Sequence, residues 1–169
     1  MSAVERIPAP GSREYRDVVG LFATGVTVLT VRAGDLLHGM TANAVASLSL
    51  EPLLVLVCVE RTTVMHKVLS AADCFALSLL TAEQERLARW FSDSSRPPGA
   101  AQFEVTGWRA GAATGAPLLD GALGWLECAV HQVLDGGDHS VFLGRVLAVE
   151  RGRPAAPLLF YQGEYRRLP

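Results

Sequence analysis

The chain has 169 residues, 50% hydrophobic and 19% charged, with a formal net charge of -2. It has no basic stripe, which argues against nucleic-acid binding, and no run of 18 apolar residues, so we expect no membrane association. So few charges around a single core favour a homodimer with a buried interface. Three isolated cysteines and the lack of a signal-peptide pattern predict a cytoplasmic protein.

The N-terminal part predicts an extension followed by a helix. We interpret residues 1–12 as the extension and residues 13–169 as one domain. Ser12 is suited to cap a helix from about Arg13 to Thr24, and Gly25 ends the pattern. The apolar residues at helical spacing are Tyr15, Val18, Val19 and Phe22. We expect this apolar stripe to pack on a sheet.

Strand-forming runs dominate the rest of the chain. They cover Val26–Val31, Leu36–Ala42, Val45–Leu50, Leu53–Val59, Cys74–Leu80, Ala122–Leu134, Ser140–Glu150 and Pro157–Gln162. A short helix is expected near Val64–Leu69, and Thr81–Gln84 matches a capping box that opens a second helix to about Phe91. Because long helical crossovers are few, we predict a mainly β (α+β) fold, an antiparallel split barrel of about six to eight strands with flanking helices.

The segment from Ser92 to Ala101 has the strongest loop composition, with Pro97, Pro98 and Gly99. Two interpretations stay open. It is either a plain surface loop or a segment that moves over or covers a ligand.

Small polar residues interrupt the strand-forming stretch Gly39–Leu50. Thr41, Asn43, Ser47 and Ser49 are all odd-numbered, so they share one face of a strand unless a bulge near Ala44 or Ala46 resets the phase. One interpretation is polar spacers in an edge strand. The other is a row of hydrogen-bonding groups for a flat polar ligand.

Two further segments contain candidate nucleotide-binding residues. His139 follows Gly137-Asp138 in an expected hairpin turn, where it is either an ordinary exposed turn residue or a nucleotide contact. Arg61 with Thr62 could hold a phosphate, although Thr62 could instead cap the next helix. The histidines lack metal-ligand spacing, and the usual nucleotide-binding and hydrolase motifs are absent from the sequence.

Several short motifs in register resemble the flavin reductase family of FMN-binding split barrels, the small reductase components of two-component flavin-dependent monooxygenases. The resemblance runs from about Phe22 to Leu168. It rests on Phe22–Thr30, Gly39–Ala44, Ser47–Pro52, Gly136–His139 and Pro157–Tyr161.

This resemblance implies a split-barrel homodimer with flavin near the subunit interface. NADH or NADPH would reduce FMN or FAD, which then diffuses to a partner monooxygenase. The implied flavin-binding residues are Met40, Thr41, Ala42, Asn43, Ser47, Leu48, Ser49, Arg61, Thr62, Phe91 and Ser92. His139 and Tyr165 would lie beside the nicotinamide nucleotide. The cofactors carry the hydride chemistry, so we predict no catalytic acid or base.

Two departures from the family pattern leave the flavin preference open: Ala44 stands where many relatives carry serine, and Leu53 replaces a second proline after Pro52. An alternative function is a split barrel that keeps flavin bound for storage or sensing. Another is a fixed-flavin enzyme that acts on an organic substrate.

Overall fold

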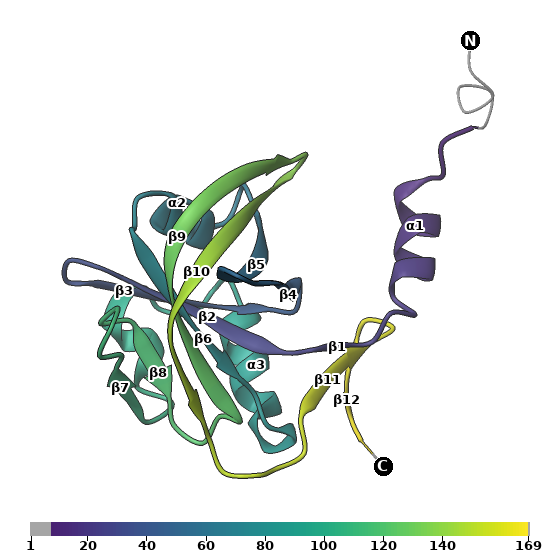
Figure 1. The fold of residues 1–169 in the computed structure, drawn as a ribbon. Helices are drawn as coiled ribbons and strands as arrows, with labels where there is room; N and C mark the ends of the chain where they lie inside the picture. Colours follow the sequence, from purple (N-terminus) through teal and green to yellow (C-terminus); the bar gives the residue numbers. More distant parts are fainter. Residues whose placement is uncertain (1–7, 169) are drawn as a thin grey trace.

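The fold is built around one curved antiparallel sheet (Figure 1). The computed structural model describes residues 8–168. Seven strands of the sheet follow the order β3-β2-β6-β9-β10-β5-β4. They are β2 (Thr27–Ala33), β3 (Leu36–Ala42), β4 (Val45–Leu50), β5 (Leu53–Glu60), β6 (Cys74–Leu79), β9 (Gly124–Gly136) and β10 (His139–Arg151). The expected strands agree with these to within two residues at each end, which confirms the mainly β prediction.

The connection between β3 and β4 explains the split barrel. The two strands lie at opposite edges of the seven-stranded sheet, yet only Asn43 and Ala44 separate them in the chain. The sheet therefore curls until its two edges approach each other at this connection. Within residues 8–168, β3 pairs with β2 and β4 pairs with β5, so the two edges meet without a shared ladder. Helix α2 (Val64–Ser70) contacts β2, β3 and β5 beside this opening.

Several short elements escaped the sequence prediction. Strands β1 (Thr24–Gly25), β11 (Leu158–Tyr161) and β12 (Glu164–Arg167) form a small sheet, and β7 (Trp108–Ala110) pairs with β8 (Pro117–Leu119). Of these, only β11 was expected, from the run Pro157–Gln162. The other four strands have two to four residues and show no period in the sequence.

The second predicted helix is confirmed in a modified form. The capping box at Thr81 and Gln84 opens a 3-10 turn, η2 (Ala82–Gln84), which continues into α3 (Glu85–Ser92). A further turn, η3 (Gly99–Phe103), follows the loop after α3. The capping box therefore predicted where the helical segment begins.

Two apolar clusters hold these elements together. The first lies between the sheet and α2 and includes Val57, Met65 and Phe142. The second packs α3 and η3 against β3 through Phe91 and Phe103, whose ring centres are 5.3 Å apart. Gly39 makes this packing possible, because a Cβ atom there would lie 2.7 Å from the ring of Phe91. The second cluster therefore positions the C-terminal end of α3 beside β3.

The N-terminal helix corrects one prediction. Helix α1 (Ser12–Val19) ends at Gly20, not near Thr24, and Gly11 takes the N-cap position expected for Ser12. The helix has no buried residue and projects away from the barrel (Figure 1), so the expected packing on a sheet of the same chain is wrong. Its apolar stripe remains uncovered, with Val18 65% exposed, and Phe22 just beyond the helix is 77% exposed.

The predicted boundary between extension and domain falls at this helix. Residues 1–7 of the extension lie outside the described residues, and Ser12 already belongs to the helix. Among residues 8–168, no helix is long and apolar enough to cross a membrane.

Candidate functional site

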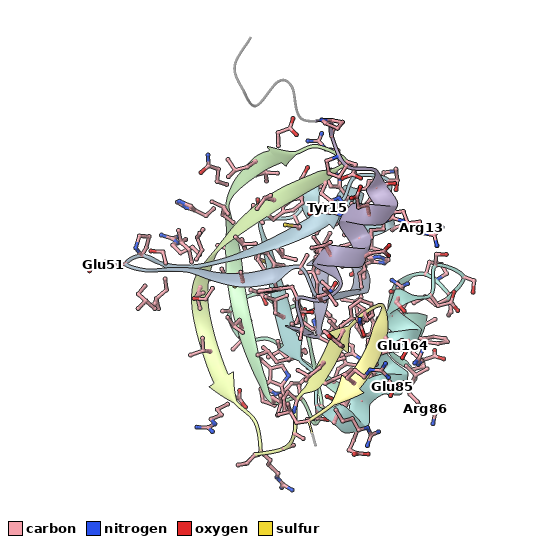
Figure 2. The ribbon with its side chains drawn as sticks, turned by 90° about the vertical axis from the view of Figure 1, so that its right-hand side faces the viewer. Arg13, Tyr15, Glu51, Glu85, Arg86 and Glu164 are labelled. Carbon is pink, nitrogen blue, oxygen red and sulfur yellow. The ribbon has the colours of Figure 1, made fainter. Side chains whose placement is uncertain are left out.

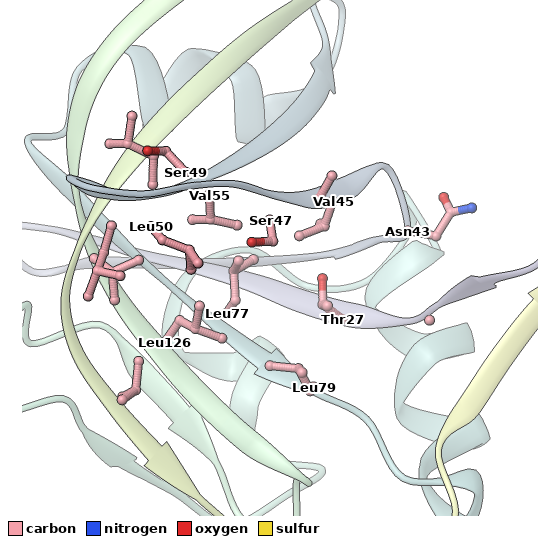
Figure 3. A pocket seen from close by; sticks show the side chains of 16 residues that line it. Thr27, Asn43, Val45, Ser47, Ser49, Leu50, Val55, Leu77, Leu79 and Leu126 are labelled. Atoms are coloured by element: carbon pink, nitrogen blue, oxygen red, sulfur yellow. The ribbon is translucent and has the colours of Figure 1, made fainter.

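One cavity brings together three residues of the predicted polar row, Asn43, Ser47 and Ser49. It has a volume of about 400 Å³ and lies between the β4–β5 hairpin and strands β6, β9 and β10. Its walls are aliphatic apart from Thr27, Asn43, Ser47 and Ser49. Figure 3 shows Ser47 directed toward the interior and Asn43 at the edge. An apolar cavity with a few polar groups suits a flat ring with polar edges.

Thr41 does not join this row. Its hydroxyl donates to the backbone oxygen of Ala88 in α3 at 2.7 Å. The phase changes at Asn43 and Ala44, which belong to no strand, and the register of β4 against β5 shifts between Ser47 and Ser49. Of the neighbouring predicted residues, Ala42 is buried in the first apolar cluster and Leu48 is half exposed.

A second cavity collects other predicted residues. It has a volume of about 470 Å³ and lies between β3, the start of α2, the end of α3 and the loop after α3. Met40, Thr62, Phe91 and Ser92 line it. Residues 94 and 96–99 of the loop form another wall, so part of the Ser92–Ala101 segment lies over a cavity, and its role as a ligand cover stays a prediction.

The structure brings Arg61 and His139 together at the tip of the β9–β10 hairpin. The Arg61 backbone N–H donates to Asp138 O at 3.0 Å, and its Nε donates to His139 O at 3.2 Å. Its guanidinium forms a 3.1 Å ion pair with Asp135. His139 Nδ1 lies 2.7 Å from the Asp138 carboxylate, and this hydrogen bond is the main reason why the pKa of Asp138 is lowered.

Tyr165 lies away from the hairpin tip that holds His139. It is part of β12, where its ring packs edge-on against Phe160 and the Arg89 guanidinium lies over it. Burial raises the pKa of Tyr165, while a hydrogen bond with Ser92 opposes the shift. The hairpin tip and β12 lie well apart in Figure 1, so one chain places Tyr165 with Ser92 and not with His139.

Sequence reasoning missed a buried network beside the second cavity. Gln102 is fully buried, its Oε1 accepts from Gly39 N at 3.2 Å, and its Nε2 lies 3.1 Å from His38 Nδ1. Arg96 Nε donates to the same Gln102 oxygen at 3.2 Å. The only hint in the sequence was the loop composition around Arg96. Within residues 8–168, no three His, Cys, Asp or Glu side chains could together hold a metal ion.

The chain is an antiparallel split barrel, and the two cavities described above suit a flat, partly apolar ligand. The chain belongs to the flavin reductase like domain family, whose model matches residues 19–169. It is 49% identical over 154 residues to an NADH-dependent FAD reductase of Streptomyces globisporus, covering 91% of this chain and 84% of the relative.

Solved structures agree with this assignment. The Streptomyces globisporus C-1027 NADH:FAD oxidoreductase SgcE6, in complex with NAD and FAD fragments, superposes with a TM-score of 0.89 at 44% identity, covering 97% of each chain. BorF, the flavin reductase component of a bacterial two-component tryptophan halogenase, gives 0.89 at 45% identity, covering 94% of this chain and 99% of BorF. The split-barrel prediction and the family resemblance are therefore confirmed.

Proposed function

We propose that this protein is an NAD(P)H:flavin oxidoreductase that reduces FMN or FAD by hydride transfer and supplies the reduced flavin to a partner monooxygenase. The observation that carries the proposal is the family match over nearly the whole barrel, with relatives named as NADH-dependent flavin reductases. Those names favour NADH as the hydride donor. The cytoplasmic location expected from the sequence stays a prediction.

The chain's own residues fit a binding and orienting role. Asn43, Ser47 and Ser49 would meet the polar edges of a flavin ring against the aliphatic wall of the first cavity. Thr62 and Ser92, which the resemblance also assigns to flavin, line the second cavity, whose described lining residues differ from those of the first. A bound flavin accepts hydride from a nicotinamide ring, so the protein has only to hold the two rings within roughly 3 to 3.5 Å and exclude water.

Oxidation of NADH and NADPH by the purified protein, followed at 340 nm with FMN or FAD in increasing excess, tests this function. Turnover over many equivalents of flavin is expected, because a carrier must release its product. A flavin with micromolar affinity is bound by about 8 kcal/mol, against about 12 at nanomolar affinity. Oxidation that stops after one equivalent would instead support the alternative of a tightly bound flavin for storage or sensing.

His139 is proposed to position the nicotinamide nucleotide from the hairpin tip. Replacing it with alanine should raise the KM for NAD(P)H about tenfold, or about 1.4 kcal/mol, and leave flavin affinity unchanged. His131→Ala is the matched control, because His131 is an exposed histidine on β9, and its KM should stay at the wild-type value. Steady-state kinetics with both variants decide the point, and an unchanged KM in His139→Ala would remove the assignment.

We infer that the protein is a homodimer. The exposed apolar residues of α1 and of the β4–β5 hairpin have no cover within the described chain, and Leu50 near the hairpin tip is 82% exposed. Glu51 marks this tip at the far edge of the barrel in Figure 2. A second copy is the occupant that the uncovered helix and hairpin favour, because each copy would cover the other's apolar surface.

Light scattering coupled to size-exclusion chromatography checks the dimer. We expect twice the chain mass for the wild type and a shift toward monomer for Leu50→Asp, because a carboxylate would be buried at the interface. Val105→Asp, which changes an exposed valine in another part of the chain, should remain dimeric. A wild type that elutes as a monomer at micromolar concentration would contradict the inference.

A further inference from the structure

Arg96 is a half-buried cation on the wall of the second cavity. Its Nη1 donates to Asp93 O at 2.5 Å, its Nε donates to Gln102 Oε1 at 3.2 Å, and its Nη2 donates to Gly39 O. All three acceptors are neutral. None of the ion pairs among residues 8–168 includes this guanidinium.

The charged groups around Arg96 do not neutralise it by contact. The Asp93 carboxylate accepts from the backbone N–H and hydroxyl of Ser95, at 2.8 and 2.7 Å, and acts on Arg96 only over a longer distance. His38 is kept neutral, because burial and the Arg96 charge lower its pKa to about 4. Burial also lowers the pKa of Arg96 itself, although guanidinium stays charged in proteins.

The network holds the guanidinium in one orientation. Gly39 lies in the edge strand β3, and the fully buried Gln102 accepts from its N–H. Trp90 Nε1 in turn donates to Gln102 O at 2.8 Å, which ties η3 to α3. A cation fixed in this way loses little side-chain entropy when it binds a ligand.

The guanidinium still has donors for an anion. It carries five N–H groups, and the three contacts above use one each from Nε, Nη1 and Nη2. One N–H on each terminal nitrogen is therefore left. Among the described residues, no aspartate or glutamate lines this cavity, whereas Thr62, Ser92 and Ser94 contribute hydroxyl groups. This surrounding suits an anion and not a cation.

Arg61, the other candidate for this role, is placed differently. Its guanidinium already pairs with Asp135 and donates to the hairpin backbone, and it does not line the second cavity. Among residues 8–168, Arg61 therefore has a carboxylate partner and Arg96 has none.

We propose that Arg96 binds the phosphate of a nucleotide held in the second cavity, through the charge-assisted hydrogen bonds that guanidinium forms with phosphate oxygens. The proposal rests on the proposed function, because that function supplies two phosphate-bearing ligands, the flavin nucleotide and the nicotinamide nucleotide. The flavin is the first source to test, since Met40 and Phe91 of the implied flavin site share the cavity.

Comparison with riboflavin isolates the contribution of the phosphate, because riboflavin carries the ring and ribityl chain of FMN without the phosphate. Binding of FMN, FAD and riboflavin is measured by flavin fluorescence for wild type, Arg96→Gln and Arg96→Lys. Arg96→Gln should weaken FMN and FAD at least tenfold and change riboflavin less than twofold, with Arg96→Lys between the two. Arg109→Gln removes an arginine paired with Glu150 on another part of the surface and should bind all three flavins as the wild type does.

A second measurement separates the two sources of phosphate. If FMN binding is unchanged, the KM for NADH is measured with riboflavin as the hydride acceptor, and a tenfold rise in Arg96→Gln assigns the contact to the nicotinamide nucleotide. Equal weakening of riboflavin and FMN would show that Arg96 only fastens the loop and would overturn the proposal, as would wild-type values throughout. A wild type without turnover on any flavin would overturn the proposed function. The binding comparison would still test whether Arg96 binds the phosphate.

Discussion

Replacing Phe91 with alanine should lower the free energy of unfolding by about 3 to 5 kcal/mol, the range for truncating a buried phenylalanine. The Phe91 ring is fully buried in the second apolar cluster, 5.3 Å from the Phe103 ring. Gly39 has no side chain to fill the space that the ring would leave, and the α3–η3 segment is fastened to β3 at the same place. The site can therefore collapse only in part, which favours the upper half of the range.

Urea unfolding of the wild type and Phe91→Ala at neutral pH measures this loss. Val105→Ala is the matched control, since it also removes apolar side-chain atoms but from a residue that is 48% exposed, and its change should stay within about 0.5 kcal/mol. A loss below about 1 kcal/mol in Phe91→Ala would mean that the surrounding residues close the cavity, contrary to the packing described above.

The same variant also reports on the site, because Phe91 lines the second cavity and the Arg96 guanidinium lies 5.9 Å from its ring centre. Removing the ring takes away one support of that arginine. FMN affinity should therefore fall in Phe91→Ala even under conditions where the variant is fully folded.

Much of the barrel could be predicted from the sequence because its strands are regular and long enough to show their pattern. Leu53–Val59 is an unbroken apolar run rich in β-branched residues, and the capping box at Thr81 marks the start of the later helical segment. The helix α1 shows the limit of this reasoning. Helical spacing of apolar residues reveals a stripe that needs cover, but it does not reveal whether the cover comes from the same chain or from a second molecule.

The candidate site, like the fold, could be predicted from the sequence only in part. Ser47 and Ser49 line the same cavity, as their odd numbers predicted, although the register of β4 shifts between them. The same parity failed for Thr41, whose hydroxyl is taken by Ala88, 47 residues further along the chain. Arg96 and Gln102 reach Gly39 across 57 and 63 residues. Such contacts depend on the tertiary fold, and no local pattern encodes them.

His38 should make the protein lose stability on mild acidification. It is 8% exposed, and Gln102 Nε2 faces its Nδ1 because Gln102 Oε1 already accepts from Gly39 N and Arg96 Nε. The network therefore assigns Nδ1 as an acceptor. A proton on Nδ1 would face a donor and place a second buried cation near Arg96, which is why burial, with the Arg96 charge, lowers the pKa of His38 from 6.5 to about 4.

The direction of this pH dependence of stability follows from proton binding. Between pH 6.5 and about 4 the unfolded chain binds a proton that the folded chain refuses, so the His38 contribution is complete above pH 6.5 and is lost as the pH falls toward 4. The loss amounts to about 3 kcal/mol over the whole interval and about 2 kcal/mol by pH 5. The lowered pKa values of Asp93 and Asp138 also make stability fall on acidification, but mainly below their ordinary value of 3.8. They therefore contribute little to the change in stability between pH 6.5 and about 4.

Urea unfolding at pH 7.5, 6, 5 and 4.5 measures the effect. His38→Asn keeps an acceptor oxygen for Gln102 but cannot titrate, so its stability should fall by about 2 kcal/mol less than that of the wild type between pH 7.5 and 5. His131→Asn, at an exposed position, should follow the wild-type curve. If His38→Asn and the wild type lose the same stability over this range, another group carries the pH dependence and the buried network tolerates a charged His38. If they differ as expected, the result shows that His38 stays neutral in the folded protein because of its burial beside Arg96.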